Sequence, residues 1–182
     1  MTMHSVYMCC FIKSNSKTKD ILLVDKHHKF IEDHGVRLVK SFKLATGRDL
    51  FPLRQEQLGT GDDLTVGQQL FSAPQIIVSH DGCEDPLLNY GNRAALELWD
   101  MTWDEFIGTP SRYTAEPQER NDRSSMLEQA KVKGYIDNYQ GIRISSKGRR
   151  FMIRNAIIWS VPAFNNGKTG QAATFSEWYF CD

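Results

Sequence analysis

Long apolar runs and a surplus of charge are both missing from this sequence of 182 residues. The longest apolar run lies around Val6–Ile12, and it is far too short to span a bilayer. The formal net charge at pH 7 is zero, so no overall field would attract nucleic acid or an anionic membrane. These absences exclude a membrane-spanning helix, and they argue against nucleic-acid and membrane partners.

Cysteine is scarce, and its spacing fits no familiar framework. The four cysteines are Cys9, Cys10, Cys83 and Cys181, which have no zinc-type spacing and suggest no disulfide pattern. A reducing compartment is therefore favoured, and we expect the protein to be cytoplasmic. Residues 1–19 lack acidic side chains, so organelle targeting by this segment is the weaker alternative.

Motifs for catalysis, phosphate binding and metal binding are also missing. Ser79, His80 and Asp81 are the residue types of a catalytic triad, but consecutive strand residues point to opposite faces and cannot converge. His80 and Cys83 would supply only half of a metal site, and a hairpin turn explains them better. No histidine follows His80 to serve as an axial haem ligand. We expect neither an enzyme nor a metal site.

Charge, although balanced overall, is unevenly distributed along the chain. Residues 81–122 contain ten acidic and three basic residues, whereas residues 138–176 contain six basic residues and no acidic one. Such asymmetry indicates solvated faces of opposite sign, with a docking surface as the alternative.

The chain divides into three regions. Residues 1–26 lack periodicity and are expected to be a disordered extension, 27–70 to form an N-terminal helix and connector, and 71–182 to form the core. Within the second region, apolar residues recur at helical spacing and form one stripe: Ile31, Leu38, Val39, Phe42 and Ala45.

The core begins with two strands and short helices. The strands are "PQIIVSH" and "LLNYGN", joined by the turn "HDGCEDP". Asn92 is a predicted N-cap for a helix over 93–99, and Thr102 with Glu105 forms a predicted capping box. A polar helix is predicted from Pro117 to Gly134, and "GQAATFSEWYF" is the predicted final strand.

Between them, residues 135–161 alternate on both sides of Lys147-Gly148 and predict a long hairpin. A two-residue turn pairs positions whose numbers sum to about 295. Ile142 and Ile144 then face Ile153 and Phe151 on the core side, and this side is continued by Ile157, Trp159 and Val161.

The same register sets Gln140 opposite Asn155 in the middle of the apolar face. These two side chains either satisfy each other or orient a bound ligand. The candidate ligand pocket is Gln140, Ile142, Ile144, Phe151, Ile153, Asn155 and Trp159.

On the outer face, this register places Arg143 opposite Met152, with two further arginines diagonal to it. A solvated face is favoured over a partner surface. The helical stripe either covers its own sheet or exchanges onto a second copy, which would make a homodimer. The candidate partner surface is Ile31, Leu38, Phe42, Arg143, Arg150 and Arg154.

Two strands, short helices and three more strands form the element order of a PAS domain. The segments "LLNYGNRAALELWDMTWDEFIGTPSRYTAEP", "GYIDNYQGIRISSKGRRFMIRNAIIW" and "GQAATFSEW" resemble the MEKHLA family over roughly residues 28–180. Members occur in cyanobacteria and other microbes, and as the C-terminal module of plant class III homeodomain–leucine-zipper transcription factors. The resemblance implies a PAS-like α+β fold, an antiparallel sheet with short helices on one face and an N-terminal helix, but no established reaction or ligand.

The stretch "GTPSRYTAEP" aligns with the loop that holds the reactive cysteine in light-oxygen-voltage domains, a related PAS branch. Ser111 occupies the cysteine's position, and the flavin-contacting asparagines align onto Arg143 and Ile153. A serine hydroxyl cannot replace the thiol, so we expect neither a bound flavin nor a light-induced adduct. The loop is expected to be structural, stiffened and braced by Pro110, Ser111, Arg112, Glu116 and Pro117.

The sequence therefore predicts a sensory or regulatory module that binds a small ligand, a protein partner or a second copy of itself. A pure protein-interaction domain without a ligand is the main alternative, and an enzyme ranks third. Ligand and partner are left open.

Overall fold

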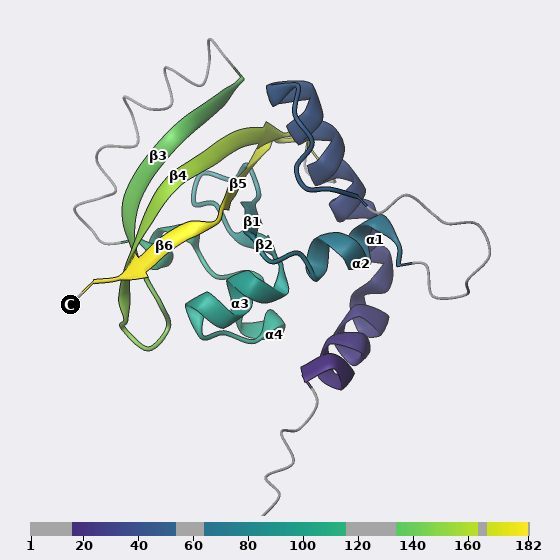
Figure 1. Ribbon diagram of the computed structural model, residues 1–182, viewed down its shortest axis with the longest axis horizontal. Helices are drawn as coiled ribbons and strands as arrows, with labels where there is room; N and C mark the ends of the chain where they lie inside the picture. The colour runs from purple at the N-terminus through teal and green to yellow at the C-terminus, as the bar shows by residue number, and fades with distance from the viewer. Residues whose placement is uncertain (1–15, 54–63, 116–133, 164–166, 182) are drawn as a thin grey trace, which may run out of the picture.

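The computed structural model describes residues 16–53, 64–115, 134–163 and 167–181, which form one sheet with helices packed on its two faces (Figure 1). The helices are α1 (Ser16–Thr46), α2 (Val66–Phe71), α3 (Arg93–Trp99), α4 (Trp103–Phe106) and the 3₁₀ helix η1 (Ser111–Thr114). The strands are β1 (Ile76–His80), β2 (Leu88–Gly91), β3 (Tyr135–Ile144), β4 (Arg150–Val161), β5 (Gly170–Phe175) and β6 (Glu177–Phe180).

The strands form one antiparallel sheet in the order β2-β1-β5-β4-β3, with β6 also paired to β4. This order, with the short helices inserted after β2, is the PAS topology, so the predicted α+β fold class is confirmed. Arg154 pairs with Glu177 and Ile157 with Thr174, so β6 continues the register of β5 on β4. The predicted final strand is thus one strand interrupted at Ser176.

The helix caps follow the local sequence. Asn92 is completely buried, and its side-chain oxygen accepts from the Ala95 amide at 3.1 Å at the start of α3. Thr102 and Glu105 bond reciprocally at the start of α4, so the predicted N-cap and capping box are confirmed. The predicted helix over 117–134 lies largely outside the described residues, and Gly134 is followed directly by β3.

Helix α1 begins at Ser16, within the region predicted to be an extension. No glycine or proline occurs between Ser16 and Lys26, so no helix-breaking residue stops the helix there. It is interrupted at His27, whose backbone is non-helical. Gly67 of α2 lies against α1 so closely that a Cβ there would stand 2.7 Å from Glu32 Cα.

The apolar stripe of α1 packs within the chain. Ile31, Leu38 and Phe42 are at most 3% exposed. Phe42 meets the ring of Trp159 on β4 at a centroid distance of 5.0 Å, and the Trp159 indole donates to Ser41 Oγ at 2.9 Å. Of the two arrangements considered for this stripe, the single chain adopts the one in which α1 covers its own sheet.

The β3–β4 hairpin has a different register from the predicted one. Its loop is the three residues 146–148, closed by bonds from Ser145 N to Arg149 O and from Gly148 N to Ser145 O, each 2.9 Å. Gly148 has φ +76°, as the last residue of such a loop requires. Paired positions near the loop therefore sum to 294, with Arg143 opposite Phe151. The predicted register was wrong by one residue.

A shift of one residue exchanges the two faces of a strand. Arg143 lies on the inner face, toward α3 and η1, where Ile142 and Ile144 were expected. Ile142 pairs with Met152 and Ile144 with Arg150, so these isoleucines lie on the outer face.

Strand β4 also changes face at a bulge around Asn155, which has φ +52°. Before it, Phe151 packs on Trp99 of α3; after it, Trp159 packs on α1. Trp159 therefore does not continue the Phe151 side, contrary to the prediction. Asn155 is exposed and donates to Glu177 Oε2 at 2.9 Å, so no buried pair with Gln140 forms.

Within the described ranges, none of the helices is both long and apolar enough to cross a membrane.

Candidate ligand-binding cavity

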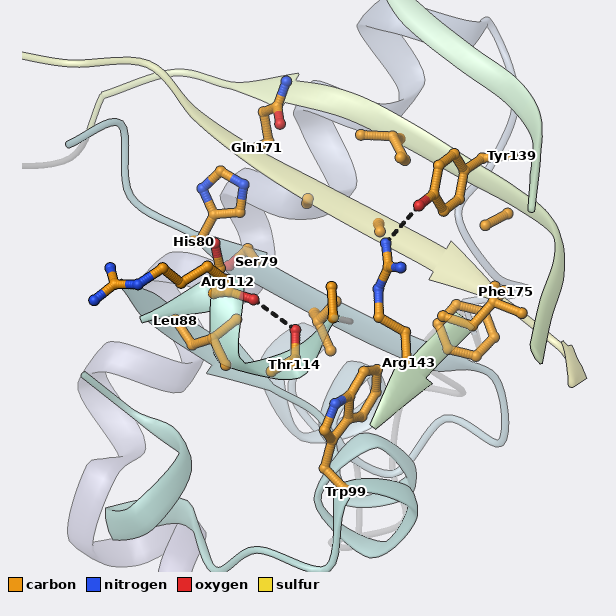
Figure 2. Close-up of a pocket in the computed structure, with 18 of the residues that line it drawn as sticks. Ser79, His80, Leu88, Trp99, Arg112, Thr114, Tyr139, Arg143, Gln171 and Phe175 are labelled. Atoms are coloured by element: carbon orange, nitrogen blue, oxygen red, sulfur yellow. Dashed lines mark hydrogen bonds between the residues drawn. The ribbon is translucent and has the colours of Figure 1, made fainter. Parts of the chain in front are cut away.

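A cavity of about 150 Å³ lies on the inner face of the sheet, beneath β3, β4 and β5 and beside α3 and η1 (Figure 2). Its walls are mainly apolar. They include Val78, Leu88, Trp99, Phe106, Ile136, Ile153, Ala156, Ile158, Ala173 and Phe175.

Arg143 projects from β3 into this cavity, between Trp99 and Tyr139 (Figure 2). Its guanidinium donates to the Tyr139 hydroxyl at 2.7 Å and to the Ile142 carbonyl at 2.9 Å. The guanidinium carbon also lies 5.3 Å from the centre of the Tyr139 ring. The side chain is thereby fixed in one orientation within the cavity.

A second arginine stands at the rim. Arg112 forms an ion pair with Asp85 and a hydrogen bond of 3.1 Å with the Tyr113 hydroxyl. Its head group points away from Arg143 (Figure 2). Asp85 thus neutralises the charge of Arg112.

The loop from Pro110 to Ala115 forms one wall. Pro110 bridges to Leu87, Ala115 bridges to Arg143, and Ser111 N donates to the Pro86 carbonyl at 2.8 Å. These contacts brace the loop. The predicted structural role therefore agrees with the observed contacts for the described part, while Glu116 and Pro117 lie outside the described residues.

Two buried polar atoms of cavity-lining residues have no hydrogen-bond partner among the residues that the structure places. They are the hydroxyl of Ser111, a residue only 7% exposed, and the indole nitrogen of Trp99, a residue 3% exposed. Burying such a group unbonded costs about 1–3 kcal/mol. A bound ligand with acceptor atoms would remove that cost.

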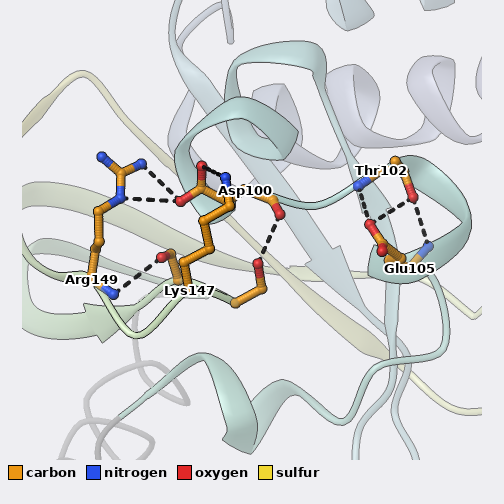
Figure 3. Close-up of polar contacts among 7 residues, drawn as sticks. Asp100, Thr102, Glu105, Lys147 and Arg149 are labelled. Carbon is orange, nitrogen blue, oxygen red and sulfur yellow. Dashed lines mark hydrogen bonds and ion pairs between the residues drawn. The ribbon is translucent and has the colours of Figure 1, made fainter.

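The wall containing Trp99 is tied to the hairpin by Asp100 (Figure 3). The Asp100 carboxylate accepts from Arg149 at 2.8 and 3.1 Å and from Lys147 at 3.2 Å, and its carbonyl accepts from Ser146 Oγ at 2.8 Å. The hydrogen bonds and charge of Arg149 lower the pKa of the Asp100 carboxylate, and those of Lys147 lower it to a smaller extent. The clamp connects the end of α3 to the β3–β4 loop beside the cavity.

Only part of the predicted pocket lies at this cavity. Gln140 and Ile153 line it, and Phe151 packs next to it on Trp99. The remaining four predicted residues lie on the outer face, in the bulge or against α1: Ile142, Ile144, Asn155 and Trp159.

Arg143, Ser111 and Trp99 were not predicted as cavity residues. The sequence feature that could have indicated the inward position of Arg143 is the "SSKG" segment. Its glycine suits a three-residue hairpin loop as well as a two-residue one, and the three-residue loop places Arg143 on the inner face. Of the predicted basic strip, Arg150 and Arg154 are exposed on the outer face and Arg143 is not part of it.

A separate series of hydrogen bonds joins α1 to the sheet. The His34 Nε2 and Ser79 Oγ atoms are 2.9 Å apart, and Ser79 Oγ donates to Asn89 Oδ1 at 2.6 Å. Because a hydroxyl has one hydrogen, His34 Nε2 must be the donor to Ser79. Burial, and secondarily the charge of Arg37, lowers the pKa of His34 to about 4.

These hydrogen bonds do not run in the direction that a catalytic pair needs, since a histidine that donates to a serine cannot accept its proton. His80 points its Nδ1 to the Asp81 carbonyl at 2.7 Å, while the Asp81 carboxylate accepts from the Cys83 and Leu87 amides. The His80–Cys83 segment is thus a turn, and the described parts of the chain contain no group of three metal-ligating side chains.

Comparison with known proteins gives a family match over most of the chain. The family model of the MEKHLA domain matches residues 32–180. Homeobox-leucine zipper protein ATHB-9 of Arabidopsis thaliana is 26% identical over 145 residues, covering 79% of this chain. That alignment covers 17% of the plant protein, so the chain spans less than a fifth of its relative's length.

Solved structures with similar architecture include a PAS domain from Colwellia psychrerythraea, with a TM-score of 0.49 and 13% identity over 58% of this chain and 88% of that one. A light-oxygen-voltage domain studied with a flavin analogue has a TM-score of 0.47 and 15% identity over 66% and 87% of the two chains. A fungal light-oxygen-voltage photoreceptor has a TM-score of 0.44 and 12% identity over 70% and 84%.

Proposed function

The chain belongs to the MEKHLA domain family, and from this premise we propose that it is a PAS-like sensory module that binds a small ligand in the cavity beneath β3, β4 and β5. The observation that supports the proposal is an apolar cavity lined by a few buried polar groups with unused hydrogen-bonding capacity. Ligand sites in proteins have this composition.

Flavin is not the ligand in this proposal. Arg143 and Ile153, which align with flavin-contacting asparagines, both line the cavity. An isoleucine there offers no hydrogen bond to the polar edge of a flavin ring. The cavity of about 150 Å³ is also smaller than the 300–1,000 Å³ typical of drug-sized ligands.

We further propose that the protein is not an enzyme and works in the cytoplasm. The polarity of the Ser79–His34 bond supports the first point. The second point is supported by the sequence, in which the four cysteines have no spacing typical of a disulfide framework.

Native mass spectrometry of the purified protein tests ligand binding directly. We expect a bound small molecule that is lost in Ala173→Leu, because the larger side chain extends into the cavity. The matched control is Ala163→Leu, which makes the same change at an exposed position. A spectrum of ligand-free wild-type protein, or equal ligand occupancy in the two variants, would contradict the proposal.

A second candidate function is protein association. Trp178, Tyr179 and Phe180 of β6 are 38%, 52% and 43% exposed, and clustered exposed aromatic side chains are typical of interaction surfaces. The partner proposed for this surface is a second copy of the chain.

A further inference from the structure

We infer that the cavity is built for a small organic carboxylate, about one ring in size, whose carboxylate binds Arg143. The inference rests on the proposed ligand-binding function and names the chemical class of the ligand. It draws on charge, hydrogen-bonding capacity, size and preorganisation.

The cavity has an unbalanced positive charge. Among the described residues, no aspartate or glutamate lines it. The rim residue Arg112 is already paired with Asp85, whereas Arg143 has no carboxylate partner among the residues that the structure describes. A buried or half-buried cation is stabilised by an anion, and Arg143 lacks one within the placed part of the chain.

Several hydrogen-bond donors at the cavity are unused in the described structure. A guanidinium has five N–H groups, and the contacts described for Arg143 use two of them. The Trp99 indole is a donor only, and it has no acceptor in the described structure. A carboxylate supplies acceptors without donors, which is the complement of this set.

Size and wall composition define the rest of the ligand. An apolar cavity of about 150 Å³ holds a molecule the size of benzene, and this cavity has about that volume. Phe106, Phe175, Leu88 and Ile153 provide apolar walls. A ligand with one negative charge, carried on one ring or on a short branched chain, would match both the guanidinium of Arg143 and these apolar walls.

The arginine is also held in place before a ligand arrives. Tyr139 holds the guanidinium from one side, and the bridge between Ala115 and Arg143 fixes the backbone next to it. A preorganised guanidinium loses little conformational entropy on binding.

The test measures binding of sodium benzoate and of its neutral isostere benzamide by isothermal titration calorimetry. We expect benzoate to bind the wild type at least about tenfold more tightly than benzamide, a difference of about 1.4 kcal/mol. Arg143→Gln should weaken benzoate binding by a similar factor and leave benzamide unaffected. Arg154→Gln removes the same charge from an exposed position on the outer face and should change neither affinity.

Equal affinities for benzoate and benzamide, or equal benzoate affinity in Arg143→Gln and wild type, would overturn the carboxylate inference and leave ligand binding in the cavity standing. If the wild type binds neither benzoate nor cyclohexanecarboxylate, the inference is overturned too. The proposed function is decided separately, by the native mass spectrometry of the wild type and of the Ala173→Leu and Ala163→Leu variants described above. If Arg143→Gln does not fold, the comparison of benzoate with benzamide on the wild type still tests the carboxylate inference.

Discussion

His34 is the residue whose protonation is expected to destabilise the fold at acidic pH. It is 2% exposed and packs between the rings of Phe30 and Tyr90, and the charge of Arg37 acts on it. Burial disfavours the protonated ring, which places its pKa at about 4, against 6.5 for an unperturbed histidine.

The folded pKa is lower than the unfolded one, so the unfolded chain takes up a proton first as the pH falls. The stability contributed by neutral His34 is therefore complete above about pH 6.5 and is lost progressively toward pH 4, by up to roughly 3 kcal/mol. Urea unfolding at pH 7 and at pH 4.5 measures this loss. His34→Gln should flatten the pH dependence, whereas the exposed-site control His28→Gln should retain it. Parallel curves for the wild type and His34→Gln would contradict the assignment.

At the scale of elements, the bulge in β4 depends on one backbone conformation. Asn155 has φ +52°, a region that costs most side chains about 1–2 kcal/mol, but that asparagine tolerates and glycine adopts freely. Its side chain is exposed, so substitution there changes little packing.

We therefore expect Asn155→Ala to be less stable than Asn155→Gly by about 1 kcal/mol or more. Both variants lose the bond to Glu177, so the difference between them isolates the backbone term. Thermal and urea unfolding give the measurement. Equal stability of the two variants would show that the bulge does not depend on this conformation.

Elements encoded by a few adjacent residues were predictable from sequence. The α3 cap at Asn92 and the α4 capping box each depend on side chains within three positions of the cap, and both form as predicted. The order of strands and helices along the chain was likewise predictable from the residue patterns, and the fold class from the family resemblance.

The faces of the hairpin were not predictable in the same way. A two-residue and a three-residue loop both suit the segment around Gly148, yet they place opposite sets of side chains in the core. The bulge at Asn155 then exchanges the faces a second time. Consequently the predicted register placed Ile153 on the inner face, where it lies, but it placed Arg143 on the outer face and Trp159 on the wrong side of the sheet.

At the scale of the whole molecule, β6 is an exposed apolar surface within the described part of the chain. The α1 stripe is buried in its own chain, so a dimer through that stripe would require exchange of the helix. The three aromatic side chains of β6 are exposed without any rearrangement. We therefore propose that the homodimer forms through this strand.

Light scattering at tens of micromolar should give a dimer mass for the wild type and a monomer mass for Tyr179→Asp, because a charge in an apolar interface is costly. Tyr113→Asp is the control, since Tyr113 is 58% exposed on η1 and lies outside β6. A monomeric wild type, or the same mass in both variants, would exclude this dimer.

The three-residue loop at 146–148 has an evolutionary consequence. Because it sets which residues of β3 face the cavity, its geometry decides the charge of the cavity wall without any change in the strands themselves. If the same sequence paired across a two-residue loop at Lys147-Gly148, Arg143 would turn outward and Ile142 or Ile144 inward. A substitution that changes the turn type of this loop would thus replace a charged wall with an apolar one, a step that comparison of the strand residues alone would not reveal.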